Sequence, residues 1–355
     1  MKKIGFIIGS MVGGGAERVI SVISEMFVND NYEVHLIIFR KTEDLYHIDD
    51  KINVHFLSCN EGKIKRNITL PWRLIKKINE INADLYISFC ILENCLSCFS
   101  KIFIKNKLVI SERNAPNNEI LSFHLRVMRK LFYRFADGIV FQTNEAKFCY
   151  SKKLQKKGEI IPNPLKDNLP EKTDYDNNYK IAAIGRLAIQ KNYPMLLNAF
   201  SHVLKEHPEY ELHIFGVGPL EDSLKQLVID LGIDDSVVFK GFSKNIHNEI
   251  LNYDMYVMTS DYEGMPNSLM EAMAIGVPSI STNCPSGGPK VLITNNENGI
   301  LVPVNDYLTL SKKMNMLIKN YDERSRIGEN SKKIRQKYSR DSIYKLWKIY
   351  TSKFL

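Results

Sequence analysis

The sequence predicts an α/β protein of two consecutive domains, each with a doubly wound parallel sheet. Three observations predict this class. Short apolar runs alternate with helical segments throughout the 355 residues, a length that suffices for two domains. A glycine-containing loop follows the first apolar run of each half, at Gly13–Gly15 and at Gly185. A polar, sparse segment, Lys166–Asn178, has the composition of a linker between domains.

The first domain is expected over residues 1–165. A strand at Ile4–Gly9 leads through a glycine-rich loop into a helix, Ala16–Phe27, with apolar residues on one face. The loop reads G-G-G-A-E-R and lacks the third glycine of a dinucleotide-binding fingerprint, which argues against an NAD-dependent oxidoreductase. The other elements expected here are strands Val34–Phe39, Leu85–Phe89, Leu108–Ile110 and Ile139–Thr143 and helices Pro71–Ile81 and Phe123–Ala136.

The helix expected at Phe123–Ala136 has two faces. It is either a surface helix with a solvated basic stripe or a contact for a lipid-carrier diphosphate or anionic lipid headgroups. Residues 1–165 contain 25 Lys and Arg against 17 Asp and Glu, whereas residues 166–355 contain 23 of each. The whole net charge of +8 therefore lies in the first half. The stripe consists of Arg126, Arg129, Lys130 and Arg134, opposite Leu125, Met128, Leu131, Phe132 and Phe135.

The second domain is expected over residues 166–340. Its first strand, Lys180–Ile184, runs into G-R-L at 185–187 and then K-N at 191–192. Cations after a strand suit phosphate oxygens, Arg as a planar fork and Lys as a compact charge. Further strands are expected at Leu212–Phe215, Val237–Lys240, Tyr253–Met258 and Ser279–Thr282, and a last helix at Ser342–Phe354.

The stretch Thr259–Pro278 carries the strongest signal. Glu263 and Glu271 stand eight positions apart around G-M-P, and a helix is expected from Asn267 to Gly276. A strand end, a loop and a helix N-terminus form an anion-binding corner, because free N–H groups and the helix dipole point into it. Carboxylates at its edges suit a ligand with phosphates and hydroxyls, such as a nucleotide sugar. The alternative is an ordinary βα unit with two solvated glutamates.

These motifs resemble one family. E-x7-E followed by A-M-A-x-G-x-P resembles the donor-site motif of retaining glycosyltransferases of family 4, and G-R-L…K-N, G-G-A-E-R and N-G-I-L-V-P at 298–303 extend the resemblance. It implies the GT-B fold: two Rossmann-like domains facing a central cleft, with residues 341–355 as a helix crossing back to the first domain. S-E-R-N-A-P at 111–116 resembles a subgroup of galactosyl and N-acetylgalactosaminyl transferases of bacterial surface glycans. Arg113 stands where many members carry a histidine.

The resemblance implies a retaining transfer of a hexose or N-acetylhexosamine from a UDP-sugar to a lipid-linked or polysaccharide acceptor, as in capsule or lipopolysaccharide synthesis. No cofactor and no nucleic acid are expected. No metal is expected either, because Arg186, Lys191 and the helix N-terminus at Asn267 are expected to supply the positive charge that a metal would carry. Glu263 is expected near the anomeric centre and Glu271 on the ribose. The catalytic set is then Glu263, Arg186 and Lys191; the donor-binding set adds Gly14, Gly15, Asn267, Ser268, Leu269 and Glu271; the acceptor-side set is Arg113, Asn114, Arg126, Arg129 and Lys130.

The remaining inferences concern location and thiols. The chain has no apolar run of eighteen residues, and its short N-terminal run reads as a strand, so a cytoplasmic protein peripheral to the anionic membrane face is expected. Cys90, Cys95 and Cys98 have an iron–sulfur-like spacing but are expected to be buried thiols. A non-catalytic sugar-nucleotide-binding or nucleic-acid-binding protein is a further alternative.

Overall fold

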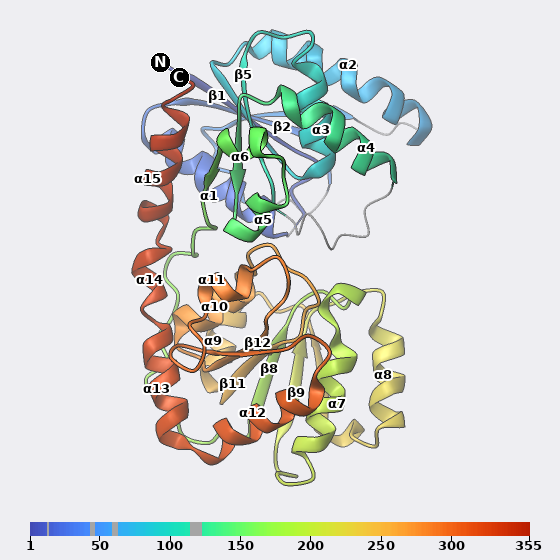
Figure 1. The fold of residues 1–355 in the computed structure, drawn as a ribbon, viewed down its shortest axis with the longest axis vertical. Coiled ribbons are helices and arrows are strands. Elements are labelled where there is room, and N and C mark those ends of the chain that lie inside the picture. Colours follow the sequence, from blue (N-terminus) through green and yellow to red (C-terminus); the bar gives the residue numbers. More distant parts are fainter. Residues whose placement is uncertain (13, 43–46, 59–62, 114–122) are drawn as a thin grey trace. The chain divides into compact units, whose positions relative to one another are not determined.

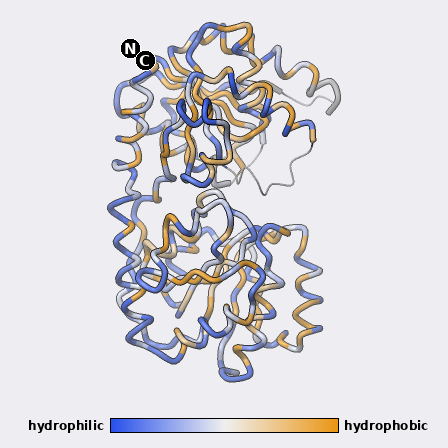
Figure 2. The backbone as a smooth tube through the Cα atoms, in the orientation of Figure 1, coloured by the Kyte–Doolittle hydropathy of each residue, from blue (hydrophilic) through white to orange (hydrophobic). Residues whose placement is uncertain are grey.

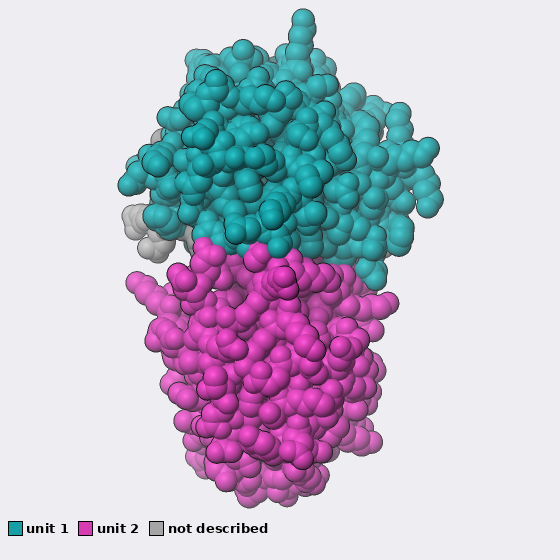
Figure 3. Space-filling model, turned by 90° about the vertical axis from the view of Figure 1, so that its left-hand side faces the viewer, with its two compact units in different colours: residues 1–164, 340–355 teal, residues 165–339 magenta. Residues whose placement is uncertain are grey.

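The chain forms two units in the computed structural model, which describes residues 1–12, 14–42, 47–58, 63–113 and 123–355. Unit 1 comprises residues 1–164 and 340–355, and unit 2 comprises residues 165–339 (Figure 3). These borders lie one residue before those expected from the sequence. Each unit contains a parallel sheet with helices packed on it, which is the predicted fold class (Figure 1).

Unit 1 is built on a parallel sheet with the order β3-β2-β1-β4-β5-β6-β7. The central strands are buried on both faces, so they read as apolar runs, orange in Figure 2. Strands β2 and β3 follow on one side of β1, and β4 and the later strands follow on its other side. The strand order therefore reverses between β1 and β4, which makes their carboxyl ends the switch point of the sheet. The strands are β1 (Lys3–Ile8), β2 (Glu33–Arg40), β3 (Asn53–Ser58), β4 (Leu85–Phe89), β5 (Lys107–Ser111), β6 (Gly138–Phe141) and β7 (Gly158–Ile160).

The last helix of the chain belongs to unit 1, as expected. Trp347 on this helix is fully buried and stacks on Phe89 at a centroid distance of 5.9 Å. The Tyr350 hydroxyl accepts a hydrogen bond from the Ile139 amide at 2.8 Å. The helices of unit 1 are α1 (Gly15–Asn29), α2 (Lys63–Ile81), α3 (Ile91–Ser100), α4 (Phe123–Phe132), α5 (Asn144–Phe148), α6 (Lys152–Lys156) and α15 (Arg340–Thr351), with a 3-10 turn at Tyr133–Phe135.

Four elements of unit 1 differ from the prediction. The helix expected to start at Pro71 starts eight residues earlier, because apolar residues at helical spacing, such as Leu70 and Leu74, bury a face that continues through the proline. The helix expected to reach Ala136 ends at Phe132 and continues as a 3-10 turn that buries Tyr133. Strands β3 and β7 were not predicted, because β3 is a half-exposed edge strand and β7 has only three residues.

Unit 2 repeats the plan with the order β10-β9-β8-β11-β12-β13, and its switch point lies between β8 and β11. The strands are β8 (Lys180–Ile184), β9 (Glu211–Phe215), β10 (Val237–Gly241), β11 (Met255–Met258), β12 (Ser279–Thr282) and β13 (Ile300–Val302). The helices are α7 (Tyr193–Val203), α8 (Glu221–Asp230), α9 (Ile246–Glu249), α10 (Asn267–Ile275), α11 (Gly288–Leu292), α12 (Tyr307–Lys319), α13 (Tyr321–Ser331) and α14 (Ile334–Lys337), with 3-10 turns at Ile189–Lys191, Asp234–Ser236 and Ile250–Asn252. No helix in the described part of the chain is long and apolar enough to span a bilayer.

Candidate functional site

The loop that carries Glu263 joins β11 to α10 in unit 2. As predicted, Glu263 lies ahead of the helix and Glu271 lies past its first turn, and α10 ends where Gly276 adopts a left-handed φ of 98°. A Cβ on Gly288 would lie 1.7 Å from the carbonyl oxygen of Gly264. Only glycine at position 288 therefore allows the segment before α11 to close on the Glu263 loop.

Glu263 and Lys191 form an ion pair in unit 2. The Lys191 Nζ lies 2.6 Å from Glu263 Oε1, and the Ser260 hydroxyl donates to the same oxygen at 2.8 Å. The side chains of Lys191 and Glu263 are only 18% and 11% exposed. Residues 72 positions apart in the sequence, predicted to bind different parts of one ligand, are thus in direct contact.

Lys191 is positioned by the asparagine that follows it. Asn192 adopts a left-handed conformation with φ 45° and caps α7, its side chain accepting from the Met195 amide at 3.3 Å. Asparagine tolerates this backbone region better than most residues, which gives K-N a structural reason. The Asn192 side chain also donates to Asp261 Oδ1 at 2.7 Å, which ties the Lys191 turn to the loop that carries Glu263.

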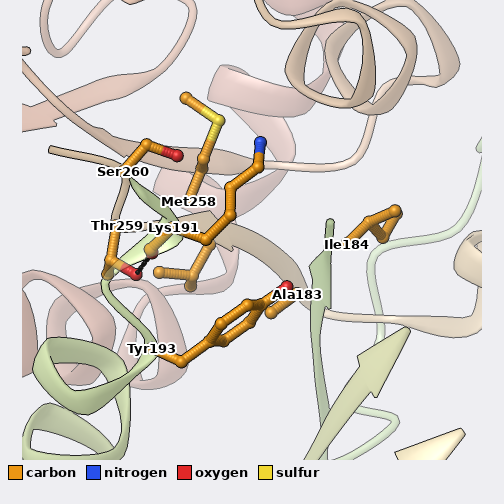
Figure 4. Close-up of a pocket in the computed structure, with 8 residues that line it drawn as sticks. Ala183, Ile184, Lys191, Tyr193, Met258, Thr259 and Ser260 are labelled. Atoms are coloured by element: carbon orange, nitrogen blue, oxygen red, sulfur yellow. Dashed lines mark hydrogen bonds between the residues drawn. The ribbon is translucent and has the colours of Figure 1, made fainter. Parts of the chain in front are cut away.

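A small pocket lies at the switch point of this sheet, where ligands bind in open α/β sheets (Figure 4). The pocket is partly open to solvent, and about 180 Å³ of space not filled by atoms, some of it open solvent, lies between its lining residues. Thr259 donates to the Lys191 carbonyl oxygen at 3.0 Å, which holds the Lys191 backbone at the rim. The pocket is lined by Ala183 and Ile184 from β8, Val257 and Met258 from β11, and Lys191, Tyr193, Thr259 and Ser260.

The N-terminus of α10 offers backbone donors beside this loop. Its N-cap is Pro266, and no described side chain caps the helix there. The Ser268 hydroxyl pairs with the Tyr256 hydroxyl at 2.9 Å, and the Leu269 side chain is fully buried. Leu269 can therefore serve a ligand only through its backbone, and the helix dipole favours an anion at this end.

Glu271 has a partner that the sequence did not predict. His247 Nε2, on the short helix α9, lies 2.9 Å from Glu271 Oε2. Both side chains are largely buried, at 16% and 13% exposed. The contact orients the Glu271 carboxylate on α10.

Arg186 contrasts with these residues. It follows β8 directly and is exposed. Its guanidinium forms no hydrogen bond or ion pair with any residue that the structure describes. The five N–H groups of this side chain are therefore available to an incoming anion.

The glycine-rich loop of unit 1 approaches a carboxylate of its own chain. A Cβ on Gly14 would lie 2.2 Å from Glu17 Oε2, and Gly15 is the first residue of α1. Burial raises the pKa of Glu17, while hydrogen bonds from the backbone amides of Glu17 and Ala16 lower it. The Glu17 carboxylate thus occupies part of the helix N-terminus.

A second carboxylate lies beside Gly9, just past the end of β1 in unit 1. Glu93 is 8% exposed, and a Cβ on Gly9 would lie 2.2 Å from its Oε1 atom. Burial raises the pKa of Glu93 to about 7, and the charge of Glu17 acts in the same direction. Cys90, the N-cap of the helix that carries Glu93, has a φ of 73°, and burial raises its pKa well above the usual range.

Arg113 is buried, which differs from an open acceptor-side contact. Its Nη1 atom donates to Asn163 Oδ1 at 2.7 Å, and the guanidinium lies 4.8 Å from the Phe89 ring centroid and 5.7 Å from that of Trp347. Burial lowers the pKa of Arg113 to about 9. In this structure Arg113 therefore packs α15 against the end of β5, while Asn114 lies outside the described residues.

The predicted basic stripe on α4 is only partly correct. Arg126, Lys130 and Arg134 are exposed, but Arg129 lies over the Tyr150 ring at 5.6 Å. Leu131, predicted to face inward, is 47% exposed. The error arises because the inward face is narrower than predicted: Leu125, Met128 and Phe132 pack against the core of unit 1, and Leu131 does not.

Three contacts at the site were not predicted, namely those of Ser260, His247 and Gly288. Ser260 lies near Glu263 in the predicted stretch, and Gly288 contacts the loop that carries Glu263. Serine and glycine are ordinary loop residues, so neither gave a signal in the sequence. His247 lies 24 positions from Glu271 and carries no local signal. Among the residues that the structure describes, no group of three or more His, Cys, Asp or Glu could hold a metal ion.

Comparison with known proteins agrees with these features. Residues 166–334, nearly all of unit 2, match the family described as glycosyl transferases group 1. The chain is 28% identical over 358 residues to an uncharacterized glycosyltransferase of Haemophilus influenzae, covering 98% of this chain and 99% of that protein. It is also 28% identical over 356 residues to an α-1,4-N-acetyl-D-galactosaminyltransferase of Campylobacter jejuni, covering 98% and 97% of the two chains.

Solved structures show the same fold. The crystal structure of Alr3699/HepE from Anabaena in complex with UDP and glucose superposes with a TM-score of 0.86 at 20% sequence identity. The match covers 99% of this chain and 100% of that chain. Two parallel-sheet, Rossmann-like units with this topology are the GT-B fold. Residues 166–334 of the chain thus resemble the group 1 glycosyl transferases, and the two units have the GT-B fold.

Proposed function

We propose that the chain moves a hexose or N-acetylhexosamine from a UDP-sugar to a lipid-linked glycan acceptor in bacterial surface-glycan synthesis, with retention of configuration as in family 4. The observation that carries the donor half is the Lys191–Glu263 ion pair, at 2.6 Å, at the switch point of the unit 2 sheet. A cation and a carboxylate held together beside a helix N-terminus match a ligand that joins a diphosphate to a polyhydroxylated ring.

The roles of the cations follow from their surroundings. Lys191 has three N–H donors, so it can bind a phosphate oxygen while it keeps its contact with Glu263. Arg186 is exposed and supplies a planar fork for the same diphosphate. The backbone amides at the start of α10, residues 267–269, add donors without a charge of their own. As negative charge develops on the leaving UDP, these groups stabilise it more than they stabilise the bound donor.

The two carboxylates have separate tasks in this proposal. Glu263 accepts from hydroxyls of the transferred sugar and lies near the anomeric carbon, where the bond to the diphosphate breaks. Glu271, whose carboxylate is held by His247, accepts from the ribose hydroxyls. No metal is required, because Arg186, Lys191 and the helix dipole supply the positive charge that a cation provides elsewhere.

The acceptor half rests on unit 1. The C. jejuni relative is named for a glycan carried on PP-undecaprenol, that is, on a lipid diphosphate. Unit 1 has 29 Lys and Arg against 18 Asp and Glu, whereas unit 2 has 19 against 22. We assign the exposed bases of α4, Arg126 and Lys130, to the acceptor phosphates and place the protein at the cytoplasmic face of an anionic membrane.

A donor screen tests this proposal. Purified protein is mixed with each of UDP-glucose, UDP-galactose, UDP-N-acetylglucosamine and UDP-N-acetylgalactosamine, with and without lipid-linked oligosaccharide. We expect one donor to release UDP only when acceptor is present, and NMR of the product to show the donor's anomeric configuration. Glu263→Gln is the matched control, since it removes one charge and keeps the shape.

Two outcomes would contradict the proposal. Tight binding of UDP-sugars without UDP release for any donor and acceptor would favour a binding protein. Binding of a nicotinamide dinucleotide in place of UDP would favour the oxidoreductase. A product of inverted anomeric configuration would refute retention, while the proposed glycosyltransferase activity would stand.

A further inference from the structure

We propose that unit 1 carries an aromatic surface, formed by α2, the end of α3 with the turn that follows it, and the end of α4, that inserts into the interfacial region of an anionic bilayer. The surface consists of Ile68, Trp72, Phe99, Ile102, Phe103 and Phe132. This inference deepens the acceptor half of the proposed function and rests on it. It adds an apolar anchor to a contact that so far involved only charge.

The rings of this surface form one continuous group. Trp72 lies 5.4 Å from Phe103 and 6.2 Å from Phe99, measured between ring centroids. Phe99 also contacts Phe103 and Phe132, each at 5.5 Å. Helix α3 lies between α2 and α4, so side chains from three elements meet on one side of the unit (Figure 1). The mutual contacts distinguish this surface from scattered exposed residues, which are ordinary on a protein.

The aromatic surface is exposed although it is rooted in the core. Trp72 is 56% exposed, Ile102 53% and Phe103 48%. Phe99 and Phe132 pack against the buried cluster of unit 1, which fixes the outer rings on a rigid base. Helix α4 also carries exposed apolar side chains, Phe123 at 74% and Leu131 at 47% exposed. Fixed aromatic rings of this kind lose little conformational freedom when they are covered.

Charge identifies the occupant as an anionic lipid surface. Helices α2, α3 and α4 together contain nine Lys and Arg and only two acidic residues. Of these two, Glu80 is ion-paired with Lys77 and Glu93 is buried. Lys76, one turn from Trp72, has a side chain that is 79% exposed. Bases around indole and phenyl rings match the interface of an anionic leaflet, where rings sit among the headgroups and cations meet phosphates.

Tryptophan fluorescence gives a direct test, because the chain has only two tryptophans. Trp347 is fully buried, so a change on adding lipid reports on Trp72. We expect vesicles of phosphatidylcholine and phosphatidylglycerol at low salt to shift the emission to shorter wavelength, and brominated lipids to quench it. At roughly 0.5 M NaCl, where the Debye length is well below 10 Å, the bases are screened and most of the binding should be lost.

Variants make the test specific. The double variant Trp72→Ala and Phe103→Ala should bind vesicles about 10-fold more weakly or worse, because it lacks two rings whose apolar surface is removed from water when the protein binds lipid. Ile229→Ala is the control, since Ile229 is 58% exposed on α8 of unit 2, and it should bind vesicles as the wild type does. The UDP affinity of all variants should equal that of the wild type, which separates this inference from the donor site.

Three results would overturn the inference. The first is co-flotation of the protein with vesicles without a change in Trp72 emission. The second is unchanged binding by the double variant, with its fold verified by circular dichroism. The third is self-association without lipid that the double variant abolishes in sedimentation, which would make the surface a contact between copies of the chain. If the wild-type protein does not bind UDP, the proposed function is refuted and the test of the aromatic surface is unaffected.

Discussion

The carboxyl edges of the two sheets treat buried charge in opposite ways. In unit 2 the two carboxylates of the site have partners: Lys191 contacts Glu263 at 2.6 Å, and His247 contacts Glu271 at 2.9 Å. In unit 1 two buried charged residues, Glu93 and Arg113, form no ion pair with any described residue. The two units share a topology, so the difference lies in the side chains that the same strand ends present.

The difference teaches which half is assembled before a substrate arrives. A matched pair holds its own geometry, so the residues proposed to bind the donor are already positioned in unit 2. A buried ionisable group without an ion-pair partner instead shifts its pKa, as Glu93 and Arg113 do in opposite directions. Unit 1 thus contains destabilising groups at its strand ends, which is common where binding is served at the expense of stability.

The largest effect is expected from breaking the pair in unit 2. Lys191→Ala should reduce turnover by about 100-fold or more, through loss of an electrostatic stabiliser. It should also destabilise the fold by about 3 kcal/mol, because Glu263, 8% exposed, loses its partner. Arg186→Ala should reduce turnover by a similar factor and leave stability within about 0.5 kcal/mol, since Arg186 is exposed. UDP release and urea denaturation measure the two quantities.

A double variant controls this prediction. Combining Lys191→Ala with Glu263→Gln removes both charges, so most of the lost stability should return while activity stays low. Turnover within about twofold of the wild type in both single variants would reject the proposed cations. Equal destabilisation by Arg186→Ala and Lys191→Ala would reject the contrast between an exposed and a paired cation.

In unit 1 we expect a substitution that removes a buried charge, Glu93→Gln, to raise the free energy of unfolding, whereas Lys191→Ala in unit 2 lowers it. The pKa of Glu93 is about 7 in the folded protein and 4.5 for an ordinary glutamate, so the folded state keeps a proton that the unfolded state loses. Stability therefore falls as pH rises from about 4.5 to 7, by about 3 kcal/mol in total. Glu93→Gln cannot ionise, so it should be more stable than the wild type at pH 8 and nearly equal to it at pH 4.5.

Denaturation at both pH values measures this effect, and Asp50→Asn, at an exposed position of unit 1, is the control. Its stability difference from the wild type should be small at either pH. A Glu93→Gln variant that is less stable than the wild type at pH 8 would show that the carboxylate has a stabilising partner. Glu93 would then not be a destabilising group, and the contrast between the two units would be refuted for unit 1.

The sequence was most informative where one helix or loop determines the geometry. The order of strand, E-G-M-P loop and helix in unit 2 was predictable, because proline and glycine exclude a helix at 264–266 and Gly276 ends one. The helix start at Pro71 was predicted wrongly, because a local rule for proline was outweighed by burial of Leu70 and Leu74. Local rules fail where tertiary packing outweighs them.

Contacts between distant segments could not be predicted from the sequence. The motifs indicated Lys191 and Glu263 as members of one site, but not their direct contact, because the sheet topology brings residues 72 positions apart together. His247 was missed for the same reason. Arg113 looked like a surface residue because arginine usually is one, and only the return of α15 with Trp347 buries it.

A smaller effect should separate the two carboxylates of unit 2. Glu271→Gln should weaken UDP binding by about 10-fold, because a charged acceptor of the ribose hydroxyls becomes a neutral one and the contact with His247 changes. Glu263→Gln should leave UDP affinity within about twofold and reduce transfer, since Glu263 is assigned to the sugar. Calorimetry with UDP and initial rates decide between them. The reverse pattern would exchange the two roles.

The smallest effect, and the one that most sharpens the contrast between the units, is expected from a chelator. In unit 2 the positive charge for a diphosphate comes from Arg186, Lys191 and the α10 N-terminus, which do not dissociate. Transfer in excess EDTA should therefore stay within about twofold of its untreated rate, a difference of about 0.4 kcal/mol in barrier height. Lys191→Ala provides the internal comparison. If this variant, but not the wild type, gains activity from Mg²⁺, a cation can replace the missing ammonium. Loss of wild-type activity in EDTA with rescue by Mn²⁺ or Mg²⁺ would show instead that the matched charges of unit 2 do not suffice for the leaving diphosphate.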